Sequence, residues 1–236
     1  MKAVILAGGF ATRLQVYYPN VIKSLIEFDN KPFLFYQLML LKKNGFSDVI
    51  ICAGHGSEKI ESYVYGHNFG MRIYVSEDGD IPLGTGGAIR KVLPLIDGDF
   101  LVIYGDSYLD FDYQAVARKF INSKKLSLMT IYHNNGNFDT SNVEFNGKKI
   151  VSYNKKNPSP KSEYIDYGAN FFERISFYSM PKVFDLSELQ EKIVNAKQME
   201  SEVIKDKFYE IGSPEGILDF QKMIEEKKDV FSQYAE

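Results

Sequence analysis

The chain opens with the stretch Met1-Lys2-Ala3-Val4-Ile5-Leu6-Ala7-Gly8-Gly9-Phe10-Ala11-Thr12-Arg13-Leu14. Residues 3–6 are continuously apolar, which is typical of a strand covered on both faces in a parallel sheet. The small residues 7–9 end this run and would let backbone N–H groups approach a bound anion closely. Arg13 and Lys23 follow, and both are positively charged. The stretch therefore predicts a buried strand that leads into a phosphate-binding loop.

Neither common phosphate-binding motif describes this loop. A Walker A motif needs Gly, four residues and then Gly-Lys-Ser/Thr, and the dinucleotide fingerprint needs Gly at three fixed offsets; the sequence satisfies neither. What remains is Gly8-Gly9, an Arg four residues after Gly9, and a Lys ten residues after Arg13. Gly-Gly alone would indicate only a turn between a strand and a helix.

The pattern resembles the signature of the sugar-phosphate nucleotidyltransferases (NDP-sugar pyrophosphorylases), Leu-Ala-Gly-Gly-x-Gly-Thr-Arg-Leu followed by Pro-Lys. Residues 6–9 and 12–14 match it, whereas Ala11 stands at a usual Gly and Ile22 at a usual Pro. Within that family it resembles the short heptose- and mannose-1-phosphate guanylyltransferase-like members. The resemblance implies one nucleotidyltransferase domain over residues 1–236. It also implies an α/β fold: an open, mostly parallel, twisted Rossmann-like sheet of the nucleotide-diphospho-sugar transferase type, with a small antiparallel addition in the second half.

Composition sets limits on partners and location. A net charge of −3 gives no electrostatic case for nucleic-acid binding. No segment approaches the roughly 20 apolar residues of a membrane span, and the short apolar run at the N-terminus does not predict a signal peptide. The single Cys52 lies in an apolar run and reads as a buried residue, which suits a reducing cytoplasm. Exposed aromatics among 16 Tyr and 18 Phe would be compatible with a homodimer.

Strands and helices alternate in the first half of the chain. Apolar runs predict strands at 48–53, 71–75, 100–104 and 126–132, and helical spacing predicts helices at 32–45 and 57–65, the latter capped by Ser57. Such alternation predicts a parallel sheet that binds ligands at the carboxyl ends of its strands.

The second half changes pattern. Asn146-Gly147 between two alternating segments predicts a β-hairpin. Residues 187–203 are expected to be helical, because Ser187 and Gln190 stand at the spacing of a capping box. Pro214 is expected to begin the last helix.

A second glycine-rich run, residues 84–87, opens a predicted helix. In the family the corresponding segment lies against the base and the sugar, and here Gly86 replaces the usual Ala. The resemblance assigns Gly84 and Thr85 to the nucleotide, and Glu77 could accept hydrogen bonds from base N–H groups. Because a carboxylate only accepts, guanine or cytosine is favoured over thymine, which predicts GTP or CTP as the nucleotide.

Asp106 follows the strand at 100–104, where acids of an open parallel sheet project into the ligand crevice. It could instead cap the next helix, although Asp110 or Asp112 fills that role more naturally. The resemblance makes Asp106 a ligand of Mg²⁺. It adds Glu210, which stands where an Asp of the family commonly completes the metal site.

The acceptor site is predicted from the second half of the chain. Lys155 stands where the family has a Lys that binds the acceptor phosphate, and Asn154 replaces a Glu that binds a sugar hydroxyl. Taken alone, Lys155 and Lys156 would indicate a solvated loop. Asp166 and Gly168 resemble the segment that lies beneath the sugar.

The reaction implied by the resemblance is attack of a sugar 1-phosphate on the α-phosphorus of a nucleoside triphosphate, which belongs to nucleotide-sugar biosynthesis for a cell-surface polysaccharide. A phosphate monoester with a second pKa near ~6 is already mostly dianionic at neutral pH, so no general base is required. The predicted catalytic residues are Arg13, Lys23 and Asp106; the nucleotide contacts are Leu6, Ala7, Gly8, Gly9, Thr12, Arg13, Glu77, Gly84 and Thr85; the substrate contacts are Lys23, Gly105, Asn154, Lys155, Asp166 and Gly168; the metal ligands are Asp106 and Glu210.

Three alternatives stay open at this point. A glycosyltransferase could use Asp110 and Asp112 to hold a metal and a nucleotide-sugar, although it would not need Arg13 and Lys23. A cytidylyltransferase for phosphocholine-like acceptors would want an aromatic or anionic cage, for which Tyr164 and Tyr167 are candidates. A non-catalytic nucleotide-sugar sensor is suggested by the changed residues 11 and 154.

Overall fold

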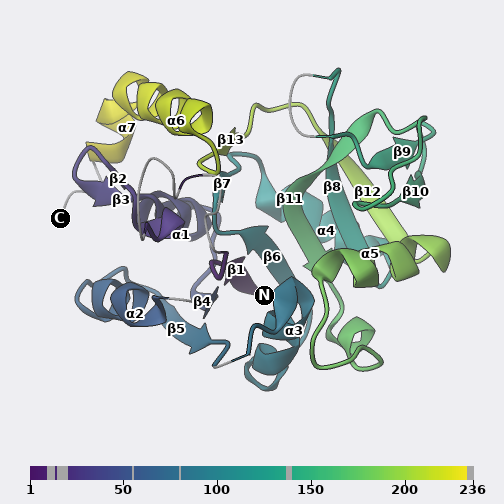
Figure 1. Cartoon of the computed structure of the whole chain (residues 1–236), viewed down its shortest axis with the longest axis horizontal. Coiled ribbons are helices and arrows are strands. Elements are labelled where there is room, and N and C mark those ends of the chain that lie inside the picture. Colours follow the sequence, from purple (N-terminus) through teal and green to yellow (C-terminus); the bar gives the residue numbers. More distant parts are fainter. Residues whose placement is uncertain (10–13, 15–20, 55, 80, 137–139, 233–236) are drawn as a thin grey trace.

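The computed structural model describes residues 1–9, 14, 21–54, 56–79, 81–136 and 140–232. A nine-stranded sheet in the order β10-β9-β11-β6-β1-β4-β5, with β8 beside β11 and β12 beside β8, runs through these residues (Figure 1). Its strands are β1 (Lys2–Leu6), β4 (Asp48–Ala53), β5 (Arg72–Glu77), β6 (Phe100–Tyr104), β8 (Ser127–His133), β9 (Val143–Phe145), β10 (Ile150–Tyr153), β11 (Tyr164–Phe172) and β12 (Met199–Ile204).

The first half of the chain forms the parallel part of the sheet. β1 lies between β4 and β6 and is parallel to both, and β5 follows β4 in parallel. β11 is antiparallel to β6 and β8, and β9 and β10 form the predicted hairpin, with Gly147 at a φ of 87° in its turn. The predicted fold class is therefore confirmed, and antiparallel pairing extends beyond the hairpin to β11.

Each face of the sheet has its own core. Ala3 and Ile5 of β1 point into one buried cluster, and the alternate residues Val4 and Leu6 point into the other. Side chains of a strand alternate between faces, so the continuous apolar run of β1 reflects a strand that is covered on both sides.

The helices are α1 (Phe33–Lys43), α2 (Ser57–Tyr65), α3 (Gly84–Val92), α4 (Tyr113–Ser123), α5 (Leu186–Asn195), α6 (Pro214–Glu226) and α7 (Lys228–Ser232), and the 3-10 turns are η1 (Lys23–Leu25), η2 (Leu93–Leu95) and η3 (Arg174–Phe177). The core that contains Ala3 includes residues of α1, α2, α4 and α6, and the core that contains Val4 includes residues of α3 and α5. Figure 1 shows α2, α6 and α7 at the end of the molecule that holds β5, and α5 at the end that holds β9, β10 and β12.

Two helix predictions need correction. The helix expected over 187–203 ends at Asn195, and residues from Met199 form β12, which pairs in parallel with β8. The capping box of α5 uses Asp185 and Glu188 in place of Ser187 and Gln190. At α2, Gly56 occupies the N-cap and Ser57 is the first helical residue. Local spacing misled in each case because sheet pairing and backbone geometry decide where a helix ends or begins.

Two short antiparallel sheets complete the fold. β2 (Glu27–Phe28) pairs with β3 (Lys31–Pro32), and β7 (Ser107–Tyr108) pairs with β13 (Tyr209–Glu210). The second pairing places Glu210 opposite Ser107, directly after Asp106 in the chain. Among the described residues, no helix has both the length and the apolar character needed to cross a membrane.

Candidate functional site

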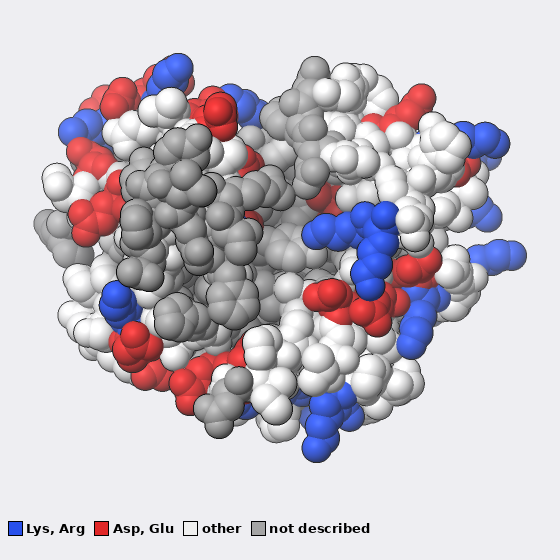
Figure 2. All heavy atoms as spheres, viewed as in Figure 1, with Lys and Arg blue, Asp and Glu red and all other residues white. Residues whose placement is uncertain are grey.

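A cavity of about 280 Å³ opens at the carboxyl ends of β1, β4 and β6. Open parallel sheets bind their ligands at this edge. The residues that line it are Leu6, Ala7, Gly8, Gly9, Lys23, Ser24, Cys52, Asp78, Pro82, Gly84, Thr85, Ala88, Tyr104, Gly105, Asp106 and Asp185. In Figure 2 the centre of this face of the molecule is hollowed.

The glycines at the cavity floor allow close backbone contact. The N–H of Gly105 donates to the carbonyl of Leu6 at 2.9 Å, and a Cβ at Gly105 would lie 2.7 Å from that same oxygen. A Cβ at Gly54 would lie 2.8 Å from the carbonyl oxygen of Gly8. The loops after β1, β4 and β6 therefore touch through backbone atoms, which leaves their outer edge to a ligand.

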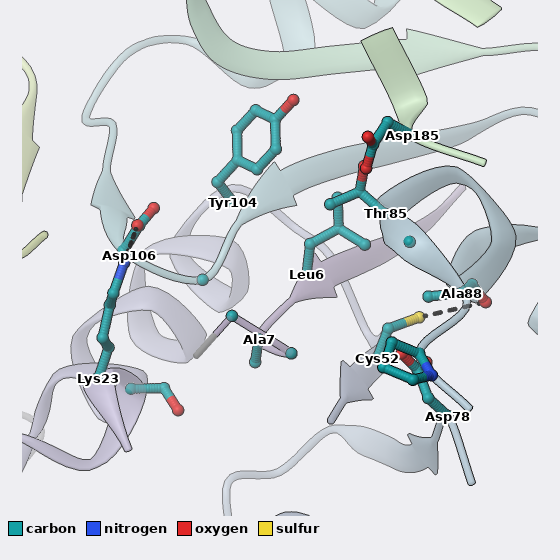
Figure 3. Close-up of a pocket in the computed structure, with 16 residues that line it drawn as sticks. Leu6, Ala7, Lys23, Cys52, Asp78, Thr85, Ala88, Tyr104, Asp106 and Asp185 are labelled. Atoms are coloured by element: carbon teal, nitrogen blue, oxygen red, sulfur yellow. Dashed lines mark hydrogen bonds and ion pairs between the residues drawn. The ribbon is translucent and has the colours of Figure 1, made fainter. Parts of the chain in front are cut away.

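Lys23 and Asp106 form the charged end of the cavity (Figure 3). The Nζ of Lys23 lies 2.9 Å from Oδ2 of Asp106, and the side chains are 22% and 35% exposed. Lys23 begins η1, whereas Asp106 lies between β6 and β7, so this pair exists only in the folded chain. A partly buried ion pair beside an anion site can exchange one partner for a phosphate oxygen at modest cost.

Glu210 approaches the same point from the last strand. Its Oε2 accepts the N–H of Gly212 at 2.5 Å and its Oε1 accepts the hydroxyl of Ser213 at 2.6 Å. A Cβ built on Gly212 would lie 2.7 Å from Oε2 of Glu210 and 3.7 Å from both Oδ2 of Asp106 and Nζ of Lys23. Three charged groups therefore surround one small space.

This donor set fits a Mg²⁺ ion. Mg²⁺ is bound through one or two carboxylates, with water and phosphate oxygens in the remaining positions. Asp106 and Glu210 supply two such carboxylates, and glycine at 212 leaves open the volume between them. Among the described residues, no group of three or more His, Cys, Asp and Glu side chains could hold a metal ion, so any ion here would depend on oxygens from a ligand.

The opposite end of the cavity holds Asp78 and Cys52 (Figure 3). Burial raises the pKa of the Asp78 carboxyl, against the opposing effects of the Leu83 N–H and the charge of Lys91. Burial likewise raises the pKa of the Cys52 thiol to about 12, so it stays protonated at neutral pH and acts as a small apolar wall.

Glu77, the predicted base contact, does not line the cavity. Its side chain is exposed, and its Oε2 accepts a hydrogen bond from the hydroxyl of Ser57 at 3.2 Å. Asp78 takes the inward position instead, because successive residues at the end of β5 point in opposite directions. The prediction from the sequence named Glu77, whereas the next residue, Asp78, lines the cavity.

The glycine-rich start of α3 is used for packing as well as for lining the cavity. The N–H groups of Gly86 and Gly87 both donate to the carbonyl of Phe184, at 3.0 and 3.1 Å. The hydroxyl of Thr85 accepts the N–H of Leu186 at 2.8 Å. These donors are therefore already satisfied within the protein, and Gly84 and Thr85 remain as the residues of the run that line the cavity.

Lys155 lies beside the cavity because it contacts the ring of Tyr104. Its Nζ is 5.8 Å from the centre of the Tyr104 ring, and Tyr104 lines the cavity. The residues on either side of Lys155 are tied to α5: Nδ2 of Asn154 donates to Glu191 at 2.8 Å, and Lys156 pairs with Glu188 at 3.9 Å. Asn154 thus anchors this loop and is not part of the cavity lining. In Figure 2, basic and acidic side chains meet beside the central hollow.

Asp166 is the centre of a hydrogen-bond network. It accepts from the N–H of Gly168 at 3.0 Å, from Nδ2 of Asn170 at 3.0 Å and from Nε2 of Gln190 at 2.9 Å. These bonds occupy both oxygens and stabilise the register shift of β11. Gly168, at a φ of 100°, packs behind Tyr104: a Cβ there would lie 3.3 Å from the ring. Both residues support the cavity wall from outside its lining.

The residues that suggested other activities have structural partners. Asp112 caps α4 by accepting the N–H of Ala115 at 2.9 Å, as predicted, and Asp110 pairs with Lys43 and Lys227 at 3.6 Å each. Tyr167 is buried and donates its hydroxyl to the carbonyl of Asp206, while the ring of Tyr164 packs against Phe145.

The predicted site residues thus fall into three groups. Those that line the cavity are Leu6, Ala7, Gly8, Gly9, Lys23, Gly84, Thr85, Gly105 and Asp106, and those that lie outside its lining are Glu77, Asn154, Lys155, Asp166, Gly168 and Glu210. Thr12 and Arg13 lie outside the described residues. Sequence reasoning missed Tyr104 and Asp185 as well as Asp78. The sequence signal that could have singled out Asp185 is its position as the N-cap of α5.

A glycine loop after the first strand and a Lys–Asp pair at the carboxyl edge of an open sheet are typical of nucleotide-binding α/β enzymes. The family described as Nucleotidyl transferase matches residues 2–227, and the chain belongs to this family. It is a nucleotidyltransferase.

Individual relatives agree with this assignment. A D-glycero-alpha-D-manno-heptose 1-phosphate guanylyltransferase of Campylobacter jejuni is 28% identical over 223 residues, which cover 93% of this chain and 98% of the relative. A UTP–glucose-1-phosphate uridylyltransferase of Synechocystis is 32% identical over 143 residues, covering 56% of this chain and 36% of the relative. The chain spans about half or less of several other relatives, among them a mannose-1-phosphate guanyltransferase of Neurospora crassa, of which 52% is covered.

Solved structures share the fold. A glucose-1-phosphate thymidylyltransferase described for Bacillus anthracis superposes with a TM-score of 0.82 at 18% identity and covers 94% of both chains. HddC from Yersinia pseudotuberculosis gives 0.76 at 24% identity, over 94% of this chain and 99% of the other. At these identities the superpositions establish the fold alone.

Proposed function

We propose that this nucleotidyltransferase joins a nucleoside triphosphate, GTP in preference, to a sugar 1-phosphate and releases pyrophosphate. The observation that carries the proposal is the Lys23–Asp106 pair, 2.9 Å apart, at one end of a cavity whose other end holds Asp78. The full-length similarity to a heptose 1-phosphate guanylyltransferase supports the choice of substrates.

The chemistry follows from charge. An oxygen of the acceptor phosphate attacks the α-phosphorus, the bond from that phosphorus to the bridging oxygen of the β-phosphate breaks, and pyrophosphate leaves with the bonding electrons. The acceptor is already dianionic, so no residue has to remove a proton. The protein must hold two polyanions together and offset their repulsion.

The chain supplies groups for each part of this task. The backbone N–H groups of Gly8 and Gly9 would face the triphosphate, whereas the N–H of Ala7 donates to the carbonyl of Cys52 at 2.8 Å. Lys23 neutralises charge near the α-phosphate. Lys155 holds the acceptor phosphate beside Tyr104. Asp106 and Glu210 would hold Mg²⁺, which when bound offsets the charge of the phosphate oxygens. Arg13, which would steady the departing pyrophosphate, and Thr12, a contact of the triphosphate, stay predictions from the sequence.

We assign the base preference to Asp78 because this residue lines the cavity. Its carboxylate accepts hydrogen bonds, and guanine offers N1–H and N2–H₂ donors, whereas cytosine offers N4–H₂. The names of the guanylyltransferase relatives favour GTP, with CTP as the second choice.

The residues that the alternative activities would require have structural roles in this fold. Asp110 and Asp112, which a glycosyltransferase would use, are engaged in ion pairs and in a helix cap. Tyr164 and Tyr167, which would cage a phosphocholine-like acceptor, pack elsewhere.

The decisive experiment is a matrix of the four ribonucleoside triphosphates and dTTP against a panel of hexose and heptose 1-phosphates, with and without Mg²⁺, scored by pyrophosphate release. The expected result is release with GTP and one class of sugar phosphate. Transfer of a sugar from an NDP-sugar without pyrophosphate would favour a glycosyltransferase, turnover with phosphocholine and CTP would favour a cytidylyltransferase, and binding without turnover would favour a sensor.

Broader properties belong to the same proposal. We expect residues 1–236 to act as one domain, in the cytoplasm, in nucleotide-sugar biosynthesis for a cell-surface polysaccharide. Exposed aromatics such as Tyr65 and Tyr74, at 62% and 49% exposure, are compatible with a homodimer. Analytical ultracentrifugation measures that oligomeric state.

A further inference from the structure

Helix α1 carries a buried amide that the proposed reaction does not use directly. Gln37 is 1% exposed and lies within nine consecutive buried residues, 33–41. An amide placed among apolar side chains is costly to bury unless its N–H groups are bonded. A leucine would suit this helix better, so the amide requires an explanation beyond packing.

The amide of Gln37 spans the turn that carries Asp106. Its Nε2 donates to the carbonyl of Tyr104 at 2.9 Å and to the carbonyl of Ser107 at 2.8 Å. Tyr104 ends β6 and Ser107 begins β7, so both hydrogens of one amide close the loop around Gly105 and Asp106. A planar amide with two donors fixes the separation of the two carbonyls as well as their direction.

The same turn is held from two other sides. The N–H of Gly105 donates to the carbonyl of Leu6, and the N–H of Ile211 donates to the carbonyl of Asp106, each at 2.9 Å. The second bond continues the pairing of β7 with β13, which places Glu210 opposite Ser107. Gln37 therefore acts on the strand that brings Glu210 to Asp106.

We propose that Gln37 is a positioning residue that sets the Asp106 carboxylate, and through β7 the Glu210 carboxylate, relative to Lys23. This inference rests on the proposed function for its kinetic consequence. Gln37 does not line the cavity, so it orients the charged end without contacting the nucleotide.

The test uses Gln37→Met, which retains length and packing but removes both donors. We expect kcat to fall at least about tenfold, because a misplacement of ~1 Å in a reacting constellation can cost about 100-fold. The KM values for triphosphate and sugar phosphate should stay within about twofold, since the binding groups are untouched. Leu41→Ala, a cavity-forming change at a 0% exposed position of the same helix, is the control for loss of α1 packing.

A second readout does not depend on turnover. Hydrogen exchange of the ligand-free protein, followed by mass spectrometry, should show faster exchange of the Gly105 and Ile211 amides in Gln37→Met than in the wild type. Leu41→Ala should not single out these amides. If Gln37→Met does not fold, Gln37→Asn, whose amide is one methylene short of the carbonyls, is measured in its place with the same expectation.

Three results would overturn the inference: wild-type kcat in the variant, an equal loss of kcat in Leu41→Ala, or unchanged exchange at the turn. A wild-type protein that releases no pyrophosphate with any substrate pair would instead refute the proposed function. The exchange comparison would then still decide whether Gln37 holds the turn.

Discussion

Lys23 and Asp106 lie 2.9 Å apart at the edge of the cavity, on segments separated by 83 residues. Both side chains are partly exposed, so their attraction contributes little to the stability of the fold, on the order of 0–1 kcal/mol. We interpret Lys23 and Asp106 as charged groups that serve ligand binding. In the proposed reaction, Asp106 would hold a cation and Lys23 would bind a phosphate oxygen.

The variant Asp106→Asn should keep the shape of the turn and remove the charge. We expect kcat to fall by about 100-fold or more, as for the loss of a preorganised electrostatic group, with a melting temperature close to that of the wild type. Glu210→Gln should act in the same direction more mildly. The matched control is Asp110→Asn, whose carboxylate pairs with Lys43 and Lys227. If Asp110→Asn lowers kcat as much as Asp106→Asn does, the metal site lies elsewhere.

Asp78 and Glu77 provide a neighbouring pair for testing base selection. Asp78 lines the cavity, whereas Glu77 is exposed and bonded to Ser57. Asp78→Asn should reduce the ratio of kcat/KM for GTP over UTP by about tenfold, because one hydrogen bond to a charged acceptor contributes about 1.5–3 kcal/mol. Glu77→Gln should leave the ratio unchanged. A larger effect of Glu77→Gln would restore the original assignment from the sequence.

At the scale of elements, the loop that contains Lys155 and Lys156 is positioned by its contacts with α5. Lys155 and Lys156 are adjacent, yet Lys155 lies over Tyr104 and Lys156 pairs with Glu188. Lys155→Ala should raise the KM for the sugar phosphate about tenfold or more and leave the KM for the triphosphate unchanged, since a charge-assisted contact to phosphate is lost. Lys156→Ala is the control. Equal changes in both KM values would indicate that Lys155 is a residue of a solvated loop and does not bind the acceptor.

The start of α3 depends on glycine for close packing against the segment at 182–186. A Cβ at Gly87 would collide with the backbone carbonyl of Lys182. We expect Gly87→Ala to destabilise the protein by about 1–2 kcal/mol, because overpacking costs about 1–3 kcal/mol and Ala regains up to about 1 kcal/mol of helix propensity. Urea unfolding measures this difference. Gly98→Ala, where a Cβ would meet no atom within 4 Å, is the control and should not destabilise.

For the whole molecule, one ion pair at the amino ends of β4 and β5 gives an acid-dependent contribution to stability. Hydrogen bonds from Arg72, at 2.7 and 2.9 Å, lower the pKa of Asp48 from 3.8 to about 2. A carboxyl whose pKa is lower in the folded state contributes stability above its unfolded pKa, and that contribution is lost as pH falls through the folded value. The stability advantage of the wild type over Asp48→Asn should therefore be full at pH 6 and disappear between about pH 4 and pH 2. Urea unfolding across this range measures it, and a difference that persists at low pH would contradict the assignment.

Local chemistry in the sequence determined the fold class and the floor of the site. The apolar run at 3–6, the glycines that follow it and the alternation of strand and helix patterns require a covered parallel sheet with a loop at its carboxyl edge. The hairpin at Asn146-Gly147 and the cap at Asp112 are equally local, because their geometry is fixed by a few neighbouring dihedrals. Nine of the predicted site residues line the cavity for this reason: Leu6, Ala7, Gly8, Gly9, Lys23, Gly84, Thr85, Gly105 and Asp106.

Only the tertiary structure decided the remaining features. Which of Glu77 and Asp78 faces inward depends on the exact end of β5, and a shift of one residue reverses the face of a strand. Met199–Ile204 forms a strand because it pairs with β8, although the local pattern predicted a helix. The meeting of Glu210 with Asp106, and the amide of Gln37 across the turn between them, join segments that lie far apart in the chain. No local pattern encodes such contacts, because they form only when the sheet and the helices that cover it bring those segments together.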